Sequence, residues 1–201
     1  QARPSLDACF DGHQAEADTW HQGKHGIRHA LALSTLDPKM ARRPMKPSGG
    51  ARPASLECST CHDPHSVDTR KAATEACLQC HDDEHSRAYP GSPHAATLVA
   101  GASGPTGPME VTCATCHLPR HELEDGAGRR IAVDHNNSFT LQPPDRMASL
   151  VCQRCHGLEL SLRALLDPQS VRTNFRGVPG GTVRSFEMVR AAGTPTGGGS
   201  L

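Results

Sequence analysis

Regular spacing of apolar residues is confined to a few stretches of the chain. In the C-terminal half a run of leucines repeats at intervals of three or four residues, the spacing of one helix face: Leu158, Leu162, Leu165 and Leu166. Asp145, which follows two prolines, is placed to cap the start of this helix, and Pro168 to end it. Further helices are predicted over residues 6–34 and over residues 185–192, where Gly193 supplies the stop.

The remaining stretches carry the signals of loops. Residues 38–53 are rich in proline and are predicted to form an extended connector, and residues 101–108 to form a loop. The predicted fold class is therefore mainly α with a large loop content and few or no strands. The expected organisation is an N-terminal helical segment (1–37), a proline-rich connector (38–54), a cofactor-binding body (55–193) and a flexible tail (194–201).

The composition provides little material for an apolar core. Only four Phe, one Tyr and one Trp occur in 201 residues, against 19 Gly and 16 Pro. Cysteine, with nine residues, and histidine, with 13, are far above ordinary usage. We therefore expect bound cofactors, rather than side chains, to supply the missing apolar volume.

The charge balance restricts the classes of partner. The 21 basic residues equal the 21 acidic residues, so no overall field attracts the chain to nucleic acid or to an anionic membrane. The longest apolar stretches fall short of the roughly 20 residues that span a bilayer, so no transmembrane segment is expected. No basic and apolar leader is present, which indicates either cytoplasmic residence or a signal peptide already removed before Gln1.

Eight of the nine cysteines belong to four copies of the pattern C-x-x-C-H. The copies are Cys58-Ser-Thr-Cys61-His62, Cys77-Leu-Gln-Cys80-His81, Cys113-Ala-Thr-Cys116-His117 and Cys152-Gln-Arg-Cys155-His156. This is the attachment pattern of c-type haem, in which two thioethers hold the porphyrin and the adjacent histidine is the proximal iron ligand. Structural zinc or four disulfides would account for the paired cysteines, but neither requires a histidine after every pair.

The motifs predict four covalently bound haem c groups with His62, His81, His117 and His156 as proximal ligands. Haems of this type are attached on the outer side of the energy-transducing membrane. The expected location is therefore periplasmic or extracellular, which favours the alternative of a removed signal peptide.

Nine further histidines are available as distal ligands, more than four irons need. His25, His65, His94 and His135 are predicted to be distal ligands, whereas His21, His29, His85 and His121 are interpreted as surface residues. An iron with two imidazole ligands has no open position for a substrate, so this ligation suits electron transfer better than catalysis. Because so few residues serve each haem, the porphyrins are expected to lie close together as a wire.

The N-terminal segment resembles the opening of multihaem cytochromes related to hydroxylamine oxidoreductase. The likeness rests on Cys9, His13, Trp20 and His25 at the expected offsets, although Gly12 stands where those proteins have the second cysteine. Two alternatives follow. Either a fifth haem remains, held by a single thioether to Cys9 with His13 as proximal ligand, or the site has lost its haem and Cys9 is a free thiol.

The same resemblance offers a competing function. Catalytic members of that superfamily need a five-coordinate haem, often with a tyrosine crosslink or a lysine proximal ligand. This chain has one tyrosine, Tyr89, and no C-x-x-C-K motif. The favoured interpretation is therefore an electron-transfer protein and not an enzyme, acting as a shuttle, a redox subunit or a protomer of an extracellular cytochrome filament. Its expected partners are redox proteins or copies of itself in a homopolymer. The alternative function is that of an oxidoreductase acting on small nitrogen compounds.

Overall fold

The computed structural model describes residues 4–34, 36, 38–46, 56–66, 68–99, 111–125 and 128–193. Within these ranges the chain consists of short helices, loops and one two-stranded sheet. The fold class is thus mainly α with few strands, as predicted. The predicted loop at residues 101–108, the second half of the connector and the C-terminal tail lie outside the described residues.

The N-terminal segment forms three short helices: α1 (Leu6–Phe10), α2 (Gln14–Gln22) and α3 (Ile27–Ala30). The prediction of one continuous helix over residues 6–34 is therefore wrong. Ser5 caps α1 by accepting from the Ala8 N–H, and α2 ends at Gly23. The chain then turns sharply at Gly26, where a Cβ atom would lie 2.3 Å from the carbonyl oxygen of Trp20. Only glycine permits this close approach.

The middle of the chain is a series of short helices. In chain order they are η1 (Pro38–Met40), α4 (Cys58–Cys61), α5 (Thr69–Ala73), α6 (Glu75–Leu78), α7 (Glu84–Ala88), η2 (Tyr89–Gly91), α8 (Pro93–Val99) and α9 (Cys113–His117). The first half of the proline-rich connector is not wholly extended, since it contains η1. Beyond η1, Met45 forms an isolated antiparallel bridge with His81, which ties the connector to the second C-x-x-C-H motif.

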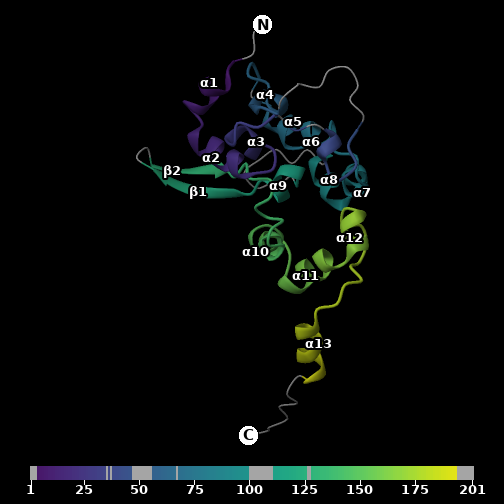
Figure 1. Cartoon of the computed structure of the whole chain (residues 1–201). Coiled ribbons are helices and arrows are strands. Elements are labelled where there is room, and N and C mark those ends of the chain that lie inside the picture. The colour runs from purple at the N-terminus through teal and green to yellow at the C-terminus, as the bar shows by residue number, and fades with distance from the viewer. Residues whose placement is uncertain are drawn as a thin grey trace.

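The sheet is a hairpin that sequence reasoning did not place. Strand β1 (Arg120–Asp125) pairs antiparallel with β2 (Gly128–Val133), and the hairpin projects from the body of the molecule (Figure 1). Opposite charges face one another in the register, with Glu124 opposite Arg129, which stabilises the pairing. At the inner end of β2, Ala132 is 2% exposed, and β2 packs against α2.

The C-terminal part contains α10 (Asp145–Leu150), η3 (Cys152–Arg154), α11 (Leu158–Leu166), α12 (Pro168–Arg172) and α13 (Arg184–Ala191). The fourth motif thus lies between two helices and not inside one long helix. Asp145 is the first helical residue after the cap, Pro144. Pro168 does end α11, as predicted, but it also opens α12 with Asp167 as its N-cap. Helix α13 matches the predicted helix closely, and Gly193 beyond it has a φ of 78°.

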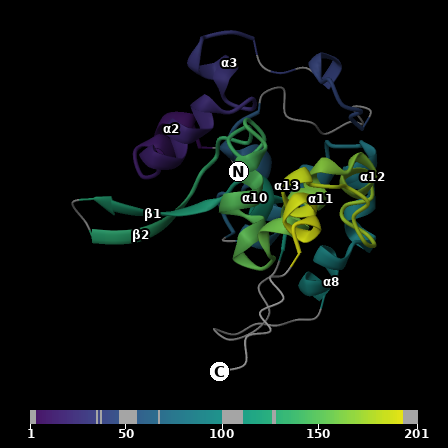
Figure 2. The same ribbon diagram turned by 90° about the horizontal axis from the view of Figure 1, so that it is seen from below.

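Figure 1 shows an elongated arrangement in which the N-terminal helices lie toward one end and α13 toward the other. Figure 2 views the molecule from the α13 end. The apolar core between the two ends is small. Among the described residues, the buried apolar side chains are those of Ala17, Tyr89, Ala95, Ala132, Met147 and Ala148. Four of these are alanines, which bury little surface, so side-chain packing alone gives this fold weak support.

Candidate haem-binding site

The C-x-x-C-H motifs share one backbone turn. In the first, second and fourth motifs the N–H of the histidine donates to the carbonyl of the first cysteine, in each case at 2.9 Å. The third motif forms helix α9. This turn brings the two cysteines and the histidine onto one side of the chain, as attachment to a single porphyrin requires.

Two of the motifs encode their own helix start. Thr60 and Thr115 occupy the same position, directly before the second cysteine. Each accepts a hydrogen bond from the backbone N–H of the residue that precedes its motif, Glu57 or Thr112, and the side chain of that residue accepts in return. These capping boxes fix the first turn of α4 and of α9, and they position the first and third motifs.

Each motif histidine faces one histidine from outside the motifs. The ring centres are 6.3 Å apart for His62 and His135, 6.2 Å for His81 and His25, 6.3 Å for His117 and His85, and 6.1 Å for His156 and His94. The partners come from four separate segments of the chain. No histidine is used twice.

This spacing fits an iron between the two rings. Two imidazoles that share a transition-metal ion have ring centres roughly 6 Å apart, because each metal–nitrogen bond is about 2 Å and each nitrogen lies about 1 Å from its ring centre. Aromatic packing alone also gives separations in this range. It does not explain why all four motif histidines pair one to one with a second histidine, and bis-imidazole ligation does.

A fifth histidine pair in the chain shows the contrast. His21 and His29 are stacked with ring centres 5.3 Å apart, and a direct hydrogen bond of 3.0 Å joins their ring nitrogens. Phe10 and Trp20 complete this aromatic cluster. The pair is too close to enclose an iron, so it is a packing contact of the N-terminal helices.

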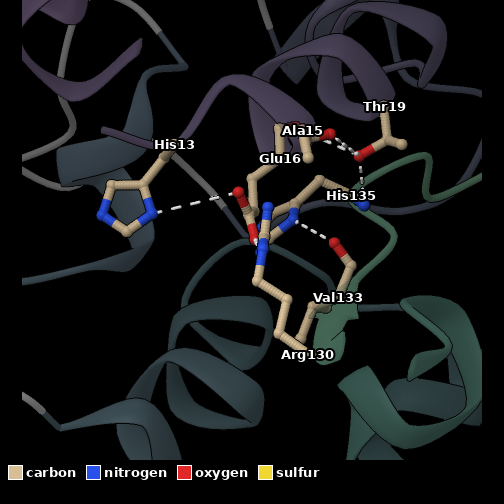
Figure 3. A network of polar contacts seen from close by, with 7 residues as sticks. All are labelled: His13, Ala15, Glu16, Thr19, Arg130, Val133 and His135. Atoms are coloured by element: carbon tan, nitrogen blue, oxygen red, sulfur yellow. Dashed lines mark hydrogen bonds and ion pairs between the residues drawn. The ribbon is translucent and has the colours of Figure 1, made fainter. Parts of the chain in front are cut away.

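The imidazole of His135 is held in one orientation (Figure 3). Its Nδ1 lies 2.9 Å from the carbonyl oxygen of Val133, and its backbone N–H donates to Thr19 Oγ1 at 2.9 Å. Thr19 in turn donates to the carbonyls of Ala15 and Glu16 in α2. A proton on Nδ1 satisfies the carbonyl and leaves Nε2 with the lone pair that a metal needs.

The imidazole of His85 is oriented in the same way by α12. Its Nδ1 lies 2.6 Å from the carbonyl oxygen of Val171, and Asn174 donates to the His85 carbonyl at 3.2 Å. The Asn174 amide is also 3.2 Å from His85 Nε2. Phe175 makes edge contacts with the rings of both His85 and His94, so it lies between the third and fourth sites. Both Asn174 and Phe175 have positive φ, and asparagine tolerates that region best.

Burial keeps several of these imidazoles neutral. It lowers the pKa of His25 to about 4, with a further decrease from His81 nearby, and it lowers the pKa of His117 to about 4, with a further decrease from His85. Burial also lowers the pKa values of His62, His81 and His94. At neutral pH these rings therefore carry no proton on one nitrogen and can bind a metal.

The thiols connect the four sites in sequence order. The neighbouring Cys113 thiol of the third motif raises the pKa of Cys77 in the second, with a further increase from burial. Burial raises the pKa of Cys61 to about 11, with further increases from Cys77 and Cys80. Burial likewise raises the pKa of Cys116 to about 12, with a further increase from Cys152 of the fourth motif. Neighbouring motifs thus lie within electrostatic contact of one another.

All nine cysteines are free thiols in the structure. In the part of the chain that the structure describes, no group of three or more His, Cys, Asp or Glu side chains is arranged to hold a metal ion.

Three of the four predicted distal ligands, His25, His94 and His135, are brought to a motif histidine. His65 is not: it is exposed, and its backbone N–H donates to Asp63 Oδ1 at 2.9 Å. It lines an open pocket beside Cys61 and His62. His85, interpreted from the sequence as a surface residue, takes the fourth place. Its position depends on Val171, 86 residues away in the sequence, so no local pattern could have identified it.

Cys9 and His13 lie at the first site. Burial raises the pKa of Cys58 to about 11, with a further increase from the Cys9 thiol. His13 contributes to the lowered pKa of His62, after burial and His135. The remaining histidine, His121, lies in β1 opposite Ala132.

Comparisons of the chain with protein-family models, with curated proteins and with solved structures found no match. None of the helices built from described residues is long and apolar enough to cross a membrane.

Proposed function

We propose that this chain is a multihaem c-type cytochrome that transfers electrons through at least four bis-histidine haems. The observation that carries the proposal is the pairing of every C-x-x-C-H histidine with one other imidazole at 6.1–6.3 Å. The cysteine pairs 58/61, 77/80, 113/116 and 152/155 would hold the porphyrins. The four imidazole pairs would hold the irons.

The ligand set explains why the function is transfer and not catalysis. Haem iron supplies a one-electron couple, and two imidazole ligands leave it no position for a substrate. The protein's part is to keep both imidazoles in place while the charge of the iron changes. The Val133 and Val171 carbonyls do this for His135 and His85 by fixing the tautomer and the ring orientation.

The order of the sites supports a wire that follows the sequence. Helix α4 of the first motif packs against α6, which contains Cys77 of the second. A thiol of the third motif raises the pKa of one in the second, and a thiol of the fourth motif raises the pKa of one in the third. Electrons that enter at one end would pass through the second and third sites to reach the other. Such a wire suits a periplasmic or extracellular shuttle, a redox subunit or a filament protomer, with other redox proteins or copies of the chain as partners. We also propose that the chain belongs to the superfamily of multihaem cytochromes related to hydroxylamine oxidoreductase.

Electron paramagnetic resonance of the oxidised protein tests the ligation. We expect low-spin ferric signals that integrate to at least four irons per chain, since two imidazoles at 6.1–6.3 Å enclose each iron. High-spin signals from most of the irons would mean that the paired histidines are not ligands. The proposal of a bis-histidine electron carrier would then be wrong.

A matched pair of variants locates the ligands. We expect His85→Ala to add one high-spin iron per chain and one carbon monoxide binding site, because it removes the imidazole opposite His117. His65→Ala is the control, and it should leave the spin state of every iron unchanged, because His65 is exposed and faces none of the motif imidazoles in the described structure. The reverse outcome would assign the ligand role to His65.

A further inference from the structure

Residues 9–13 have the backbone turn of a haem-attachment motif, although only one cysteine is present. The His13 N–H donates to the Cys9 carbonyl at 3.0 Å, as the motif histidines donate to the first cysteines of the first, second and fourth motifs at 2.9 Å. The N–H of the residue before the histidine also donates to the carbonyl of the first cysteine. The distance is 3.3 Å at Gly12 and 3.1 Å at both Cys80 and Cys155.

The position of the missing cysteine is open. A Cβ atom placed on Gly12 would meet nothing within 4 Å, and Gly12 has no positive φ. The turn therefore does not depend on glycine. A cysteine side chain fits there without displacing a neighbour.

The turn also continues the series of contacts between sites. After burial, the Cys9 thiol is the neighbour that raises the pKa of Cys58, as the Cys113 thiol of the third motif raises the pKa of Cys77 in the second. The thiols of two other segments therefore lie near the first motif: those of the second motif and that of Cys9.

His13 lies beside the first site with its ring accessible. Its side chain is 74% exposed, and its Nδ1 is 3.9 Å from Glu16 Oε2. The other oxygen of that carboxylate, Oε1, is 3.4 Å from Arg130 Nη1. Figure 3 shows His13 and His135 on the two sides of Glu16. In the described structure no second imidazole faces His13 as one faces each of the four motif histidines.

We propose that residues 9–13 bind a fifth haem through one thioether to Cys9, with His13 as its iron ligand. The inference rests on the proposed function and extends its wire by one site at the N-terminal end. The thiol of Cys9 adds across one haem vinyl group: sulfur bonds to the carbon next to the ring, and the thiol hydrogen goes to the terminal carbon. The addition needs no oxidant, and the second vinyl group stays intact.

Intact mass after denaturation, measured on protein purified from its own host, counts the covalent haems. We expect the wild type to carry five and to leave no alkylatable thiol, because all nine cysteines would be in thioethers. Cys9→Ser should carry four. Gly12→Ala, which adds a methyl group in the same open space, should still carry five.

Gly12→Cys supplies a second readout. It should also carry five haems, and the α band of its pyridine haemochrome should shift to shorter wavelength than in Gly12→Ala, because a second thioether removes the last conjugated vinyl group. A wild type with four haems and one free thiol at Cys9 would overturn the fifth site alone. Fewer than four haems would overturn the proposed function itself, so the two failures are distinguishable.

Discussion

The chain prepared without haem is expected to have no cooperative unfolding transition. The buried apolar residues of the described structure are four alanines with Tyr89 and Met147. At about 0.8 kcal/mol per buried methylene, such side chains cannot offset a backbone ordering cost of roughly 1–2 kcal/mol per residue. Bound porphyrins, each tied to a helical turn and to a distant imidazole, would join segments that otherwise have little reason to pack.

Circular dichroism and amide hydrogen exchange measure this effect. Haem-free chain, made in a compartment without haem attachment, should lose most of its helical signal and exchange its amides almost without protection. The haem-loaded protein from the same gene is the control and should melt cooperatively. Native helix content and a sharp transition in the haem-free chain would show that the side chains suffice for folding.

Removal of the second haem is expected to slow electron transfer along the molecule by orders of magnitude. Helix α6, which contains Cys77, packs against α4 of the first motif, and the Cys113 thiol of the third motif is close enough to raise the pKa of Cys77. Cys77→Ser combined with Cys80→Ser would leave the first site separated from the third. Electron tunnelling weakens exponentially with distance, so this gap affects the rate far more than the loss of one terminal haem.

A photoreductant attached to an introduced cysteine in α13, such as Ser185→Cys, would inject electrons near the fourth site. In the variant that combines Cys77→Ser with Cys80→Ser, only the haems of the third and fourth sites should be reduced in the rapid phase. The control variant combines Cys58→Ser with Cys61→Ser, which removes the haem of the first site. In this variant the haems of the second, third and fourth sites should all share the electron in the rapid phase. Equal behaviour of the two variants would contradict a linear order of sites.

The turns of the four C-x-x-C-H motifs could be predicted from the sequence because their signals are local. Each motif spans one turn of chain, so its two cysteines and its histidine are identified together. The start of α13, the end of α11 at Pro168 and the mainly helical class follow from equally local signals. These features depend on residues no more than a few positions apart.

The histidines that face the motif histidines could be predicted only in part because their positions depend on tertiary contacts. His65 is close to the first motif in sequence but remains on the surface, whereas His85 is placed by Val171 and Asn174 from α12 and the residues that follow it. The breaks in the N-terminal helix have a similar origin. Gly26 lies against Trp20, and the resulting turn carries His25 to His81.

Anomalous X-ray scattering at the iron absorption edge, from crystals of the purified protein, tests the central claim most directly. We expect at least four iron positions, one between the imidazoles of each pair: His62 and His135, His81 and His25, His117 and His85, and His156 and His94. A crystal without iron, or irons located away from these four pairs, would contradict it.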